Sequence, residues 1–350
     1  MYRNNYVGVV VIAHDEEGFI GDVIRSLPEY VDLVIAVDDQ SSDQTWPEIL
    51  EAAAESEAGE TTRIAASERP DAPDYDVTSR AELGDLNGRV LPVQNRRNRG
   101  AGGAVKTGYM VALRRNVDII VRFDGDGQMD PSLMSRFLDP IVDGRVEYTK
   151  GDRLGSSEFR RTMPRFRLVG NFMLTVLTKI ASGYWQMLDP QNGYTAVSRR
   201  ALSTIDVDGL YEYYGFLNDI LVKLNVAGVR IGDVSMPSKY GDEQSGIDYR
   251  TFVRRVSLML LQRFVWRIGE QYGRGPRVVL LGYYLGAGLS ASSVLLFASS
   301  LFSVSALPGG SSPITSMLTG VLAVLLGGWM LVGAMTLDRE RNRDLDVRLT

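Results

Sequence analysis

The chain has 350 residues, no cysteine, a single histidine and a formal net charge of −5 at pH 7. These counts exclude disulfides, thiolate metal sites and multi-histidine metal sites. The mildly acidic balance, with no basic stripe interleaved with aromatic residues, disfavours nucleic acid as a partner. The length suits one full α/β domain with something smaller beside it. No signal peptide is expected, because the N-terminus runs straight into a strand pattern.

The first hundred residues alternate strand and helix patterns. Strands are predicted at Val7–Ala13, Val31–Val37 and Arg89–Val93, and helices at Phe19–Leu27 and about Trp46–Ala58. Each strand run is largely apolar, as is usual for strands buried on both faces of a sheet. The alternation therefore predicts a parallel sheet with crossover helices.

One segment departs from this alternation. Gly59–Leu86 is polar, acidic and carries Pro70 and Pro73. Such a composition is typical of a surface insertion. We expect residues 59–86 to be mobile and to have no catalytic role.

The central stretch of the chain combines a strand pattern with acidic residues. Val117–Phe123 is mostly apolar and β-branched, and it leads into Asp124-Gly125-Asp126-Gly127-Gln128. Residues at i and i+2 of an extended chain point the same way, so Asp124, Asp126 and Gln128 can share one side. Two carboxylates and an amide oxygen suit a hard cation such as Mg²⁺ or Mn²⁺. The alternative is an acidic turn without a ligand.

A glycine-rich stretch, Asn95–Ala104, precedes a helix predicted to end at about Arg115. Free backbone N–H groups at such a helix start can face a phosphate. The same glycines can instead permit close packing of helix on sheet. The sequence leaves both interpretations open.

The next part of the chain returns to strands and helices and carries an arginine cluster. Strands are predicted at Glu147–Lys150, Tyr194–Val197 and Val229–Val234, and helices at about Arg165–Ser182 and Tyr213–Ala227. The arginines are Arg153, Arg160, Arg161, Arg165 and Arg167. They supply forked donors for a lipid phosphate, or else form a solvated face held to anionic headgroups.

The C-terminal part has the composition of a membrane segment. Thr251–Tyr272 places Phe252, Val256, Met259, Leu260 and Phe264 mostly on one face, with Arg254, Arg255, Arg263 and Arg267 interspersed. This pattern predicts a basic amphipathic helix in a membrane interface.

Two uncharged runs follow, Val278–Val304 and Ile314–Leu337, and each is long enough to span a bilayer. Arg274 and Arg277 precede the first run, and Arg339, Arg341 and Arg343 follow the second, which predicts cytoplasmic ends and an external hairpin tip. Two buried helices of a soluble core are the weaker alternative, because little chain remains to cover them. The predicted division is a catalytic domain over residues 1–245, an interfacial helix over 246–276, a transmembrane hairpin over 277–338 and a cytoplasmic tail over 339–350.

Acidic sites follow three predicted strands, after Ala13, Val37 and Phe123. Ligands of open α/β sheets bind outside the carboxyl ends of the strands, so these sites can converge on one crevice suited to a nucleotide sugar. Over roughly Val7–Lys239 the chain resembles the family 2 glycosyltransferases with a GT-A fold, and within them the polyprenyl-phosphate sugar synthases such as dolichyl-phosphate mannose and glucose synthases.

Five motifs carry this resemblance. The matching positions are Ile12-Ala13-His14-Asp15-Glu16; Asp38, Asp39, Ser41, Asp43 and Thr45; Asn98, Gly100, Gly102, Ala104 and Gly108; Asp124, Asp126 and Gln128; and Gly151-Asp152-Arg153. In the first motif the family's proline, tyrosine and asparagine are replaced, and in the last its serine is replaced.

The resemblance implies an α/β GT-A domain that moves a hexose from a UDP- or GDP-linked sugar to a polyprenyl phosphate, with inversion, at the cytoplasmic face of the cell membrane. It implies a Mg²⁺ or Mn²⁺ ion held by Asp124, Asp126 and Gln128. Nucleotide-sugar contacts are implied for Ala13, His14, Glu16, Asp39, Asn98, Gly100, Lys106 and Asp124. The implied catalytic group is Asp124, Asp126, Arg153, Arg165, Arg167 and Asp219. Roles in protein glycosylation or the cell envelope would follow, and a homo-oligomer remains open.

Three alternatives remain. A glycan or glycolipid hydroxyl acceptor would need a general base, for which Asp219 is the candidate; otherwise Asp219 lines the acceptor side. A processive polysaccharide synthase would carry more spans and a Gln-x-x-Arg-Trp motif, whereas Gln262–Trp266 has its arginine elsewhere. A non-catalytic membrane scaffold is disfavoured by the intact Asp124, Asp126 and Gln128 set.

Overall fold

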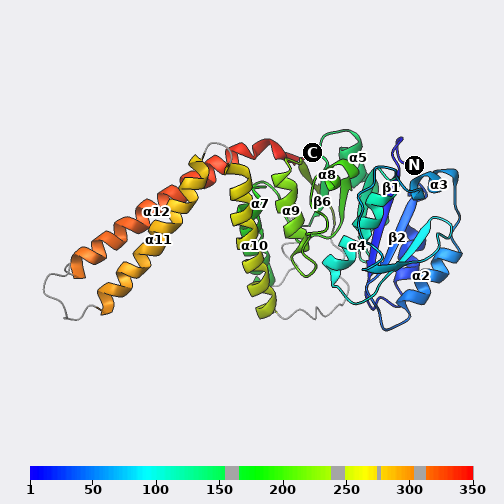
Figure 1. The fold of residues 1–350 in the computed structure, drawn as a ribbon, viewed down its shortest axis with the longest axis horizontal. Helices are drawn as coiled ribbons and strands as arrows, with labels where there is room; N and C mark the ends of the chain where they lie inside the picture. Colours follow the sequence, from blue (N-terminus) through cyan, green and yellow to red (C-terminus); the bar gives the residue numbers. More distant parts are fainter. Residues whose placement is uncertain (154–164, 238–248, 274–276, 303–312, 350) are drawn as a thin grey trace. The chain divides into compact units, whose positions relative to one another are not determined.

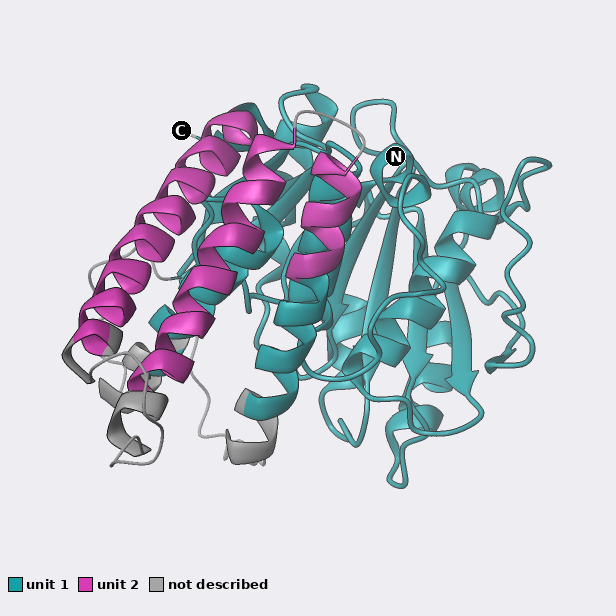
Figure 2. Ribbon diagram, turned by 60° about the vertical axis from the view of Figure 1, so that its left-hand side comes forward, with its two compact units in different colours: residues 1–263, 344–350 teal, residues 264–343 magenta. Residues whose placement is uncertain are grey.

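The computed structural model describes residues 1–153, 165–237, 249–273, 277–302 and 313–349 (Figure 1). The chain divides into two compact units (Figure 2). Unit 1 comprises Met1–Arg263 and Asp344–Thr350, and unit 2 comprises Phe264–Arg343.

Unit 1 is built on one sheet, which has nine strands within the described residues, in the order β3-β4-β2-β1-β5-β7-β6-β8-β9. The strands are β1 (Val7–Ala13), β2 (Leu33–Asp38), β3 (Ala81–Leu83), β4 (Val90–Asn95), β5 (Ile119–Asp124), β6 (Tyr148–Asp152), β7 (Thr195–Ser198), β8 (Ile231–Ser235) and β9 (Asp346–Arg348). Strands β4, β2, β1 and β5 are mutually parallel, while β3 and β7 run antiparallel to their neighbours. The predicted mostly parallel α/β sheet is confirmed.

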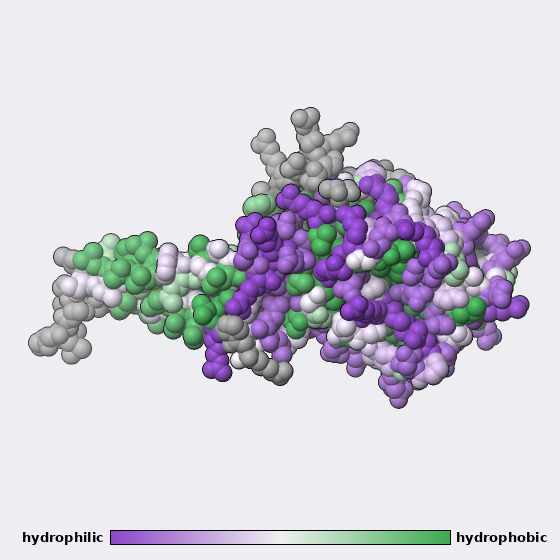
Figure 3. Space-filling model, turned by 90° about the horizontal axis from the view of Figure 1, so that it is seen from above, coloured by the Kyte–Doolittle hydropathy of each residue, from purple (hydrophilic) through white to green (hydrophobic). Residues whose placement is uncertain are grey.

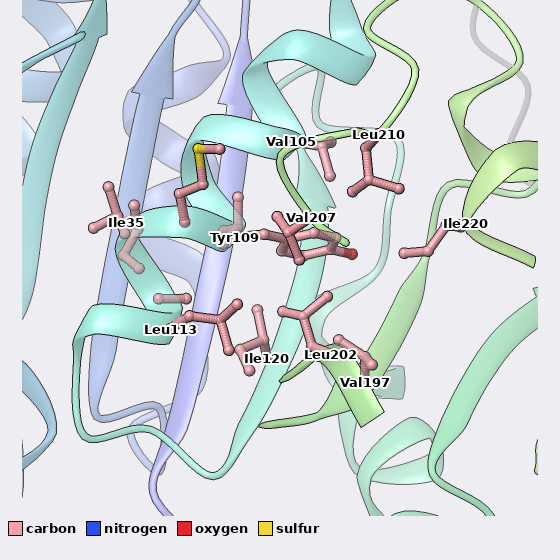
Figure 4. Close-up of a cluster of buried hydrophobic side chains, with 14 of the residues drawn as sticks. Ile35, Val105, Tyr109, Leu113, Ile120, Val197, Leu202, Val207, Leu210 and Ile220 are labelled. Atoms are coloured by element: carbon pink, nitrogen blue, oxygen red, sulfur yellow. The ribbon is translucent and has the colours of Figure 1, made fainter. Parts of the chain in front are cut away.

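Helices cover both faces of this sheet (Figure 1). Among the described residues, the helices that lie wholly in unit 1 are α1 (Ile20–Ser26), α2 (Thr45–Ala54), α3 (Glu60–Ala66), α4 (Ala101–Arg114), α5 (Met134–Val142), α7 (Arg165–Ser182), α8 (Arg199–Ser203) and α9 (Phe216–Val226), with a 3₁₀ turn at Pro131–Leu133 that Asp130 caps. Alternate residues of β1 point into separate cores: Val9 and Val11 pack with α1, α2 and α5, whereas Val10 and Ile12 pack with α4, α8 and α9. Figure 4 shows Tyr109 of α4 at the centre of the second core, among side chains from several elements.

The insertion differs from its prediction as a polar surface segment. It contains helix α3, and strand β3 pairs with β4. Ala65, Ala66, Val77 and Ala81 are buried in the core that α4 covers. The segment is therefore packed into unit 1, because small apolar residues are spaced between its charged ones.

Unit 2 contains the end of helix α10 (Tyr249–Tyr272) and the helices α11 (Val278–Phe302) and α12 (Pro313–Arg341). Val278–Phe297 and Met317–Arg341 are long and apolar enough to cross a membrane. Large apolar side chains on both helices are exposed, including Leu295 at 71% and Trp329 at 77%, and hydrophobic residues dominate the described surface of this pair (Figure 3). Exposed apolar patches of this kind are rare on water-soluble proteins and are typical of surfaces that contact lipid.

The apolar face predicted for α10 does not face outward. Val256, Met259 and Leu260 are buried. A Cβ built at Gly215 would lie 2.9 Å from Met259 Cε, so this part of α10 packs closely against the start of α9. The apolar side chains of α10 that remain exposed are Leu258, Leu261, Val265 and Trp266. Three residues of the predicted membrane face therefore pack against protein, because apolar residues occur on both sides of this helix.

Candidate active site

A pocket of about 450 Å³ lies at the carboxyl ends of β1, β2 and β5. The register explains this convergence, because Ala13 of β1 pairs with Asp38 of β2 while Ile12 pairs with Asp124 of β5. All the residues expected to contact a nucleotide sugar, except Lys106, line this pocket: Ala13, His14, Glu16, Asp39, Asn98, Gly100 and Asp124. Asp126 lines it as well, and Tyr213 and Tyr214 contribute from the loop before α9.

Asp39 is a buried carboxylate at the floor of this pocket, with 2% of its surface exposed. Its Oδ1 accepts hydrogen bonds from Asn95 Nδ2 at 2.6 Å and from the Arg99 backbone N–H at 3.0 Å. Burial raises the pKa of Asp39 above its ordinary value, while these donors act in the opposite direction. These hydrogen bonds fix the position of the Asp39 carboxylate, which lines the pocket.

The other residues of the Asp38–Thr45 motif hold the pocket's loops together. Ser41 Oγ accepts from the Asp15 backbone N–H at 3.0 Å, and Thr45 Oγ1 accepts from that of Glu16 at 2.7 Å. Asp43 Oδ2 accepts from the Glu17 N–H at 3.1 Å. These bonds fix the loop after β1 against the loop after β2, which places His14 and Glu16 at the pocket. His14 Nε2 is also 2.8 Å from Asn98 Nδ2.

Asp124 is paired with an arginine of its own strand. Arg122 is 4% exposed and makes a two-pronged ion pair with Asp124, with one contact at 3.1 Å between Nη1 and Oδ2. Residues 122 and 124 lie on the same face because they are two positions apart in β5. The arginine therefore fixes the position of this carboxylate, which lines the pocket.

The donor set fits a divalent cation that is completed by substrate. Asp124 and Asp126 both line the pocket, and Asp126 Oδ1 accepts from the Gln128 backbone N–H at 3.0 Å. Gln128 is not among the lining residues. Among the residues that the structure describes, no three acidic, histidine or cysteine side chains cluster as metal ligands. Mg²⁺ is commonly bound by one or two carboxylates plus substrate phosphates, so a two-carboxylate site is sufficient.

The glycines at the start of α4 serve close packing. A Cβ at Gly102 would lie 2.7 Å from the backbone oxygens of Tyr211 and Glu212, and one at Gly108 would overlap Val10 of β1. The Gly103 N–H already donates to the Glu212 carbonyl at 2.8 Å. At these positions the structure favours the packing interpretation over phosphate binding.

Lys106 points away from the pocket residues. Its Nζ lies 3.2 Å from a carboxylate oxygen of Asp208 and 3.2 Å from one of Glu212. The side chain is 8% exposed. It therefore supports the loop that carries Tyr213 and Tyr214 and does not line the cavity.

The expected phosphate-binding arginines are only partly described. Arg153 follows β6, and its guanidinium binds both carboxylate oxygens of Asp189, at 2.7 and 3.0 Å. Burial would raise the pKa of Asp189, but the bonds and charge of Arg153 hold it below its ordinary value. Arg160 and Arg161 lie outside the described residues. Arg165 and Arg167 form the first turn of α7, and their side chains are likewise outside the description.

Asp219 is also outside the pocket residues. It is fully buried in α9, where Oδ1 lies 2.6 Å from Arg263 Nε and Oδ2 accepts from the Tyr211 N–H at 2.8 Å. Burial raises the pKa of Asp219, and the charge of Arg263 opposes this rise. A carboxylate so engaged ties α9 to α10 and is poorly placed to take a proton from an acceptor.

Sequence reasoning missed Arg122, Tyr213 and Tyr214. A charged residue inside an apolar strand, two positions before an acidic motif, was a usable signal for Arg122. No sequence pattern indicates that Tyr213 and Tyr214 line the pocket, because this depends on how the loop before α9 folds over α4.

Comparisons with known proteins show which families and folds this chain is similar to. Residues 71–206 match the family model described as glycosyl transferase family 2. The chain is 28% identical over 233 residues to the UDP-N-acetylglucosamine–dolichyl-phosphate N-acetylglucosaminyltransferase of Methanococcus voltae, covering 66% of this chain and 85% of that protein. It is 28% identical over 166 residues to the polyprenol monophosphomannose synthase of Mycolicibacterium smegmatis, covering 45% of this chain and 59% of that one.

Solved structures show the same fold. Glucosyl-3-phosphoglycerate synthase from Mycobacterium tuberculosis, crystallised with Mn²⁺, UDP and its product, aligns with a TM-score of 0.51 at 18% identity, over 75% of this chain and 81% of that one. Residues 71–206 therefore match the family 2 glycosyltransferases, and the chain has a GT-A-like α/β fold with a mostly parallel sheet.

Proposed function

We propose that this protein transfers a hexose from a nucleotide diphosphate sugar to a polyprenyl phosphate of the dolichyl type, at the cytoplasmic face of the membrane. The observation that carries the proposal is the pocket that joins Asp39 with Asp124 and Asp126. A buried, oriented acceptor on one side and two carboxylates on the other suit the two ends of a nucleotide sugar.

The acceptor class is supported by the relatives and by unit 2. The names of the Methanococcus and Mycolicibacterium relatives specify dolichyl phosphate and polyprenol monophosphomannose. Helices α11 and α12 would hold the protein where such lipids reside. The phosphate of a polyprenyl lipid stays at the bilayer surface, because drawing its chain into water costs about 0.8 kcal/mol per CH₂ group.

The side chains of the pocket have separate tasks in this reaction. Asp39 accepts a hydrogen bond from the ribose or base, while the His14–Glu16 loop and Gly100 enclose the nucleotide. Asp124, oriented by Arg122, and Asp126 face the diphosphate end. Asp124 and Asp126 would hold a divalent cation, which would neutralise the charge of the leaving diphosphate.

A phosphate acceptor removes the need for a general base, because its oxygen is already anionic at pH 7. The ion pair of buried Asp219 with Arg263 supports this chemistry, because it disfavours Asp219 as the general base that a hydroxyl acceptor would need. We expect a single displacement with inversion, which proton coupling constants in the NMR spectrum of the product would reveal. A product with the donor's anomeric configuration would exclude it.

The test is a donor panel with the purified full chain in detergent. UDP- and GDP-linked hexoses and N-acetylhexosamines are each incubated with a polyprenyl phosphate and Mg²⁺ or Mn²⁺, and the glycolipid is quantified by mass spectrometry. One donor should give lipid-linked sugar, and excess EDTA should abolish its formation. Sugar transfer to a glycan hydroxyl but never to the lipid phosphate would overturn the proposal, and full activity in EDTA would overturn its metal requirement.

A further inference from the structure

The loop before α9, residues 211–215, brings Tyr213 and Tyr214 to the pocket. The two residues are 57% and 58% exposed, and they line the same cavity as Asp39 and Asp124. An exposed aromatic pair at a binding site offers a large apolar surface with polar tips to a ligand. Tyr213 and Tyr214 can form such a wall of the pocket only if the loop that carries them keeps its position.

Glu212, between these tyrosines and Tyr211, is the point at which the loop is held. Its backbone oxygen accepts from the Gly103 N–H at 2.8 Å, and Gly102 leaves just enough room for this approach. Its carboxylate lies 2.8 Å from Arg80 Nη1, 3.2 Å from Lys106 Nζ and 3.6 Å from Arg99 Nη1. Three cations from three segments therefore surround one carboxylate.

Electrostatic attraction stabilises the contacts of Glu212 with Arg80, Arg99 and Lys106. Burial by itself would raise the pKa of Glu212, but the hydrogen bond and charge of Arg80, with the charge of Lys106, lower it below the ordinary value. Arg80 and Arg99 have side chains only 10% and 11% exposed, so their charges are poorly hydrated and depend on this carboxylate. Glu212 consequently remains ionised and bound.

Arg80 comes from the insertion. Its backbone is held at both ends, since its N–H donates to the Val77 oxygen and its oxygen accepts from the Arg96 N–H, both at 2.9 Å. The guanidinium also reaches the Gly103 carbonyl at 3.4 Å. Arg80 thus spans from the insertion to both α4 and the tyrosine-bearing loop.

We propose that Arg80 is a positioning residue for the sugar-nucleotide site: through Glu212 it holds Tyr213 and Tyr214 as the wall that closes over the bound donor. This assigns a role to residues 59–86, which had none from sequence. The inference rests on the proposed function for the identity of the ligand. The contact of Arg80 with Glu212, which we call the clamp, does not depend on that function.

The kinetic test uses Arg80→Met, Arg80→Lys, Glu212→Gln and the Arg80→Met/Glu212→Gln double variant. Arg69→Met is the matched control, because Arg69 also belongs to the insertion but binds Asp71 and Asn116 and makes no bond to Glu212. Arg80→Met should raise the KM for the donor about tenfold with a smaller change in kcat, the size expected when one charge-assisted hydrogen bond is lost. Arg80→Lys should recover part of this effect.

The double variant distinguishes an effect of Arg80 through Glu212 from an unspecific loss of structure. If Arg80 acts through Glu212, Arg80→Met should add little in the Glu212→Gln background. Fully additive effects, or a donor KM for Arg80→Met equal to that of Arg69→Met, would overturn the proposal. Should Arg80→Met fail to fold, Arg80→Lys and Glu212→Gln supply the same comparison.

A second readout is independent of catalysis. The chain has no cysteine, so Tyr213→Cys provides a unique site for a nitroxide spin label. The label should be immobilised with Arg80 present and become mobile with Arg80→Met, but not with Arg69→Met. An unchanged spectrum would refute the clamp even if the wild-type protein transfers sugar. A wild-type protein that transfers no sugar but shows the mobility change would instead refute the proposed function and retain the clamp.

Discussion

Asp39 combines two demands that usually conflict, because it is buried and yet must be ionised to accept hydrogen bonds. Its donors are the Asn95 amide and backbone N–H groups at the start of the α4 segment. They lessen the burial effect without cancelling it, so the pKa of Asp39 stays above its ordinary value of 3.8. The residue should therefore give this site a pH dependence.

We expect nucleotide affinity to fall as the pH drops through the raised pKa of Asp39, because the protonated carboxyl accepts hydrogen bonds poorly. The folded state binds this proton more tightly than the unfolded chain, so the contribution of Asp39 to stability is greatest below its ordinary pKa and is lost as the pH rises through the raised one. Asp39→Asn should bind UDP or GDP weakly and remove this pH slope. Isothermal titration calorimetry across acidic pH checks both effects, and an unchanged slope in Asp39→Asn would contradict them.

Asp126 offers the sharpest test of metal-assisted transfer. Asp126→Asn should lower the rate by at least about 10²–10³, the usual cost of one preorganised electrostatic partner, while the protein stays folded. Asp130→Asn is the control, since Asp130 caps the 3₁₀ turn and does not line the pocket. Transfer rates and thermal unfolding of both variants decide the matter; an equal loss of activity in the two would mean that the segment matters only for structure.

At the level of single residues, the sequence predicted site residues that are close together along the chain. It did not predict contacts between segments that are far apart in the sequence. Asp124 and Asp126 were recognised because they end a strand and lie two positions apart. Lys106 was assigned to the nucleotide, yet α4 turns it toward Glu212 and Asp208. No sequence pattern reports which face of a buried helix meets which loop.

At the scale of elements, α10 shows the same limit. Its apolar residues predicted an interfacial helix, but Val256 and Met259 pack against protein, and Arg263 binds the buried Asp219. The strands, by contrast, were predicted to within a few residues, because burial on both faces leaves a continuous apolar run. Strand β3 was missed since it has only three residues, and two of them are exposed.

A buried ion pair joins two helices of unit 2, α10 and α12. Arg267 donates from Nη1 and Nη2 to the two oxygens of Asp338, each at 2.9 Å, and both side chains are fully buried. Tyr272 Oη adds a bond of 2.6 Å to Asp338, and Asn342 adds one of 3.0 Å. The end of α10 is thereby joined to the end of α12.

Arg267→Met should destabilise unit 2 by about 3–5 kcal/mol, because it leaves the Asp338 carboxylate buried without its cation. Arg267→Met/Asp338→Leu should recover part of that loss, since no buried charge remains. Thermal unfolding in detergent compares them, with Arg343→Met, whose partner Glu340 is exposed, as a control of little effect. A double variant less stable than the single would show that the charge of Asp338 is not the cause.

At the scale of the whole molecule, the C-terminal segment determines how the chain connects the two units. After α12 the chain returns to unit 1, where β9 pairs in parallel with β8, Ile231 opposite Asp346. Asp346 Oδ2 accepts from the Met187 N–H at 2.8 Å, which anchors this short strand. The segments on both sides of the α11–α12 hairpin therefore belong to the same folded unit. Sequence reasoning treated residues 339–350 as a tail, because a three-residue strand with one buried position gives no periodic signal.

This arrangement leads to a prediction about membrane topology. Unit 1 cannot lie on both sides of a bilayer, so the segment between its two stretches, Phe264–Arg343, must cross the membrane an even number of times. Arg277 before α11 and Arg339 and Arg341 at the end of α12 favour the cytoplasm for these ends. A water-soluble sugar nucleotide also has to reach the pocket from that side.

Single cysteines can test this directly, since the chain has none of its own. Glu57→Cys and Asp344→Cys lie at exposed positions of unit 1, and Ser311→Cys lies between the two spans, outside the described residues. In intact cells a membrane-impermeant maleimide should label Ser311→Cys alone, and the other two should react only after permeabilisation. Labelling of Asp344→Cys from outside, with Glu57→Cys still protected, would mean that the chain crosses the membrane an odd number of times. The pairing of β9 with β8 could then not exist in the membrane-bound protein, so this outcome would contradict the topology and the fold of the C-terminal strand together.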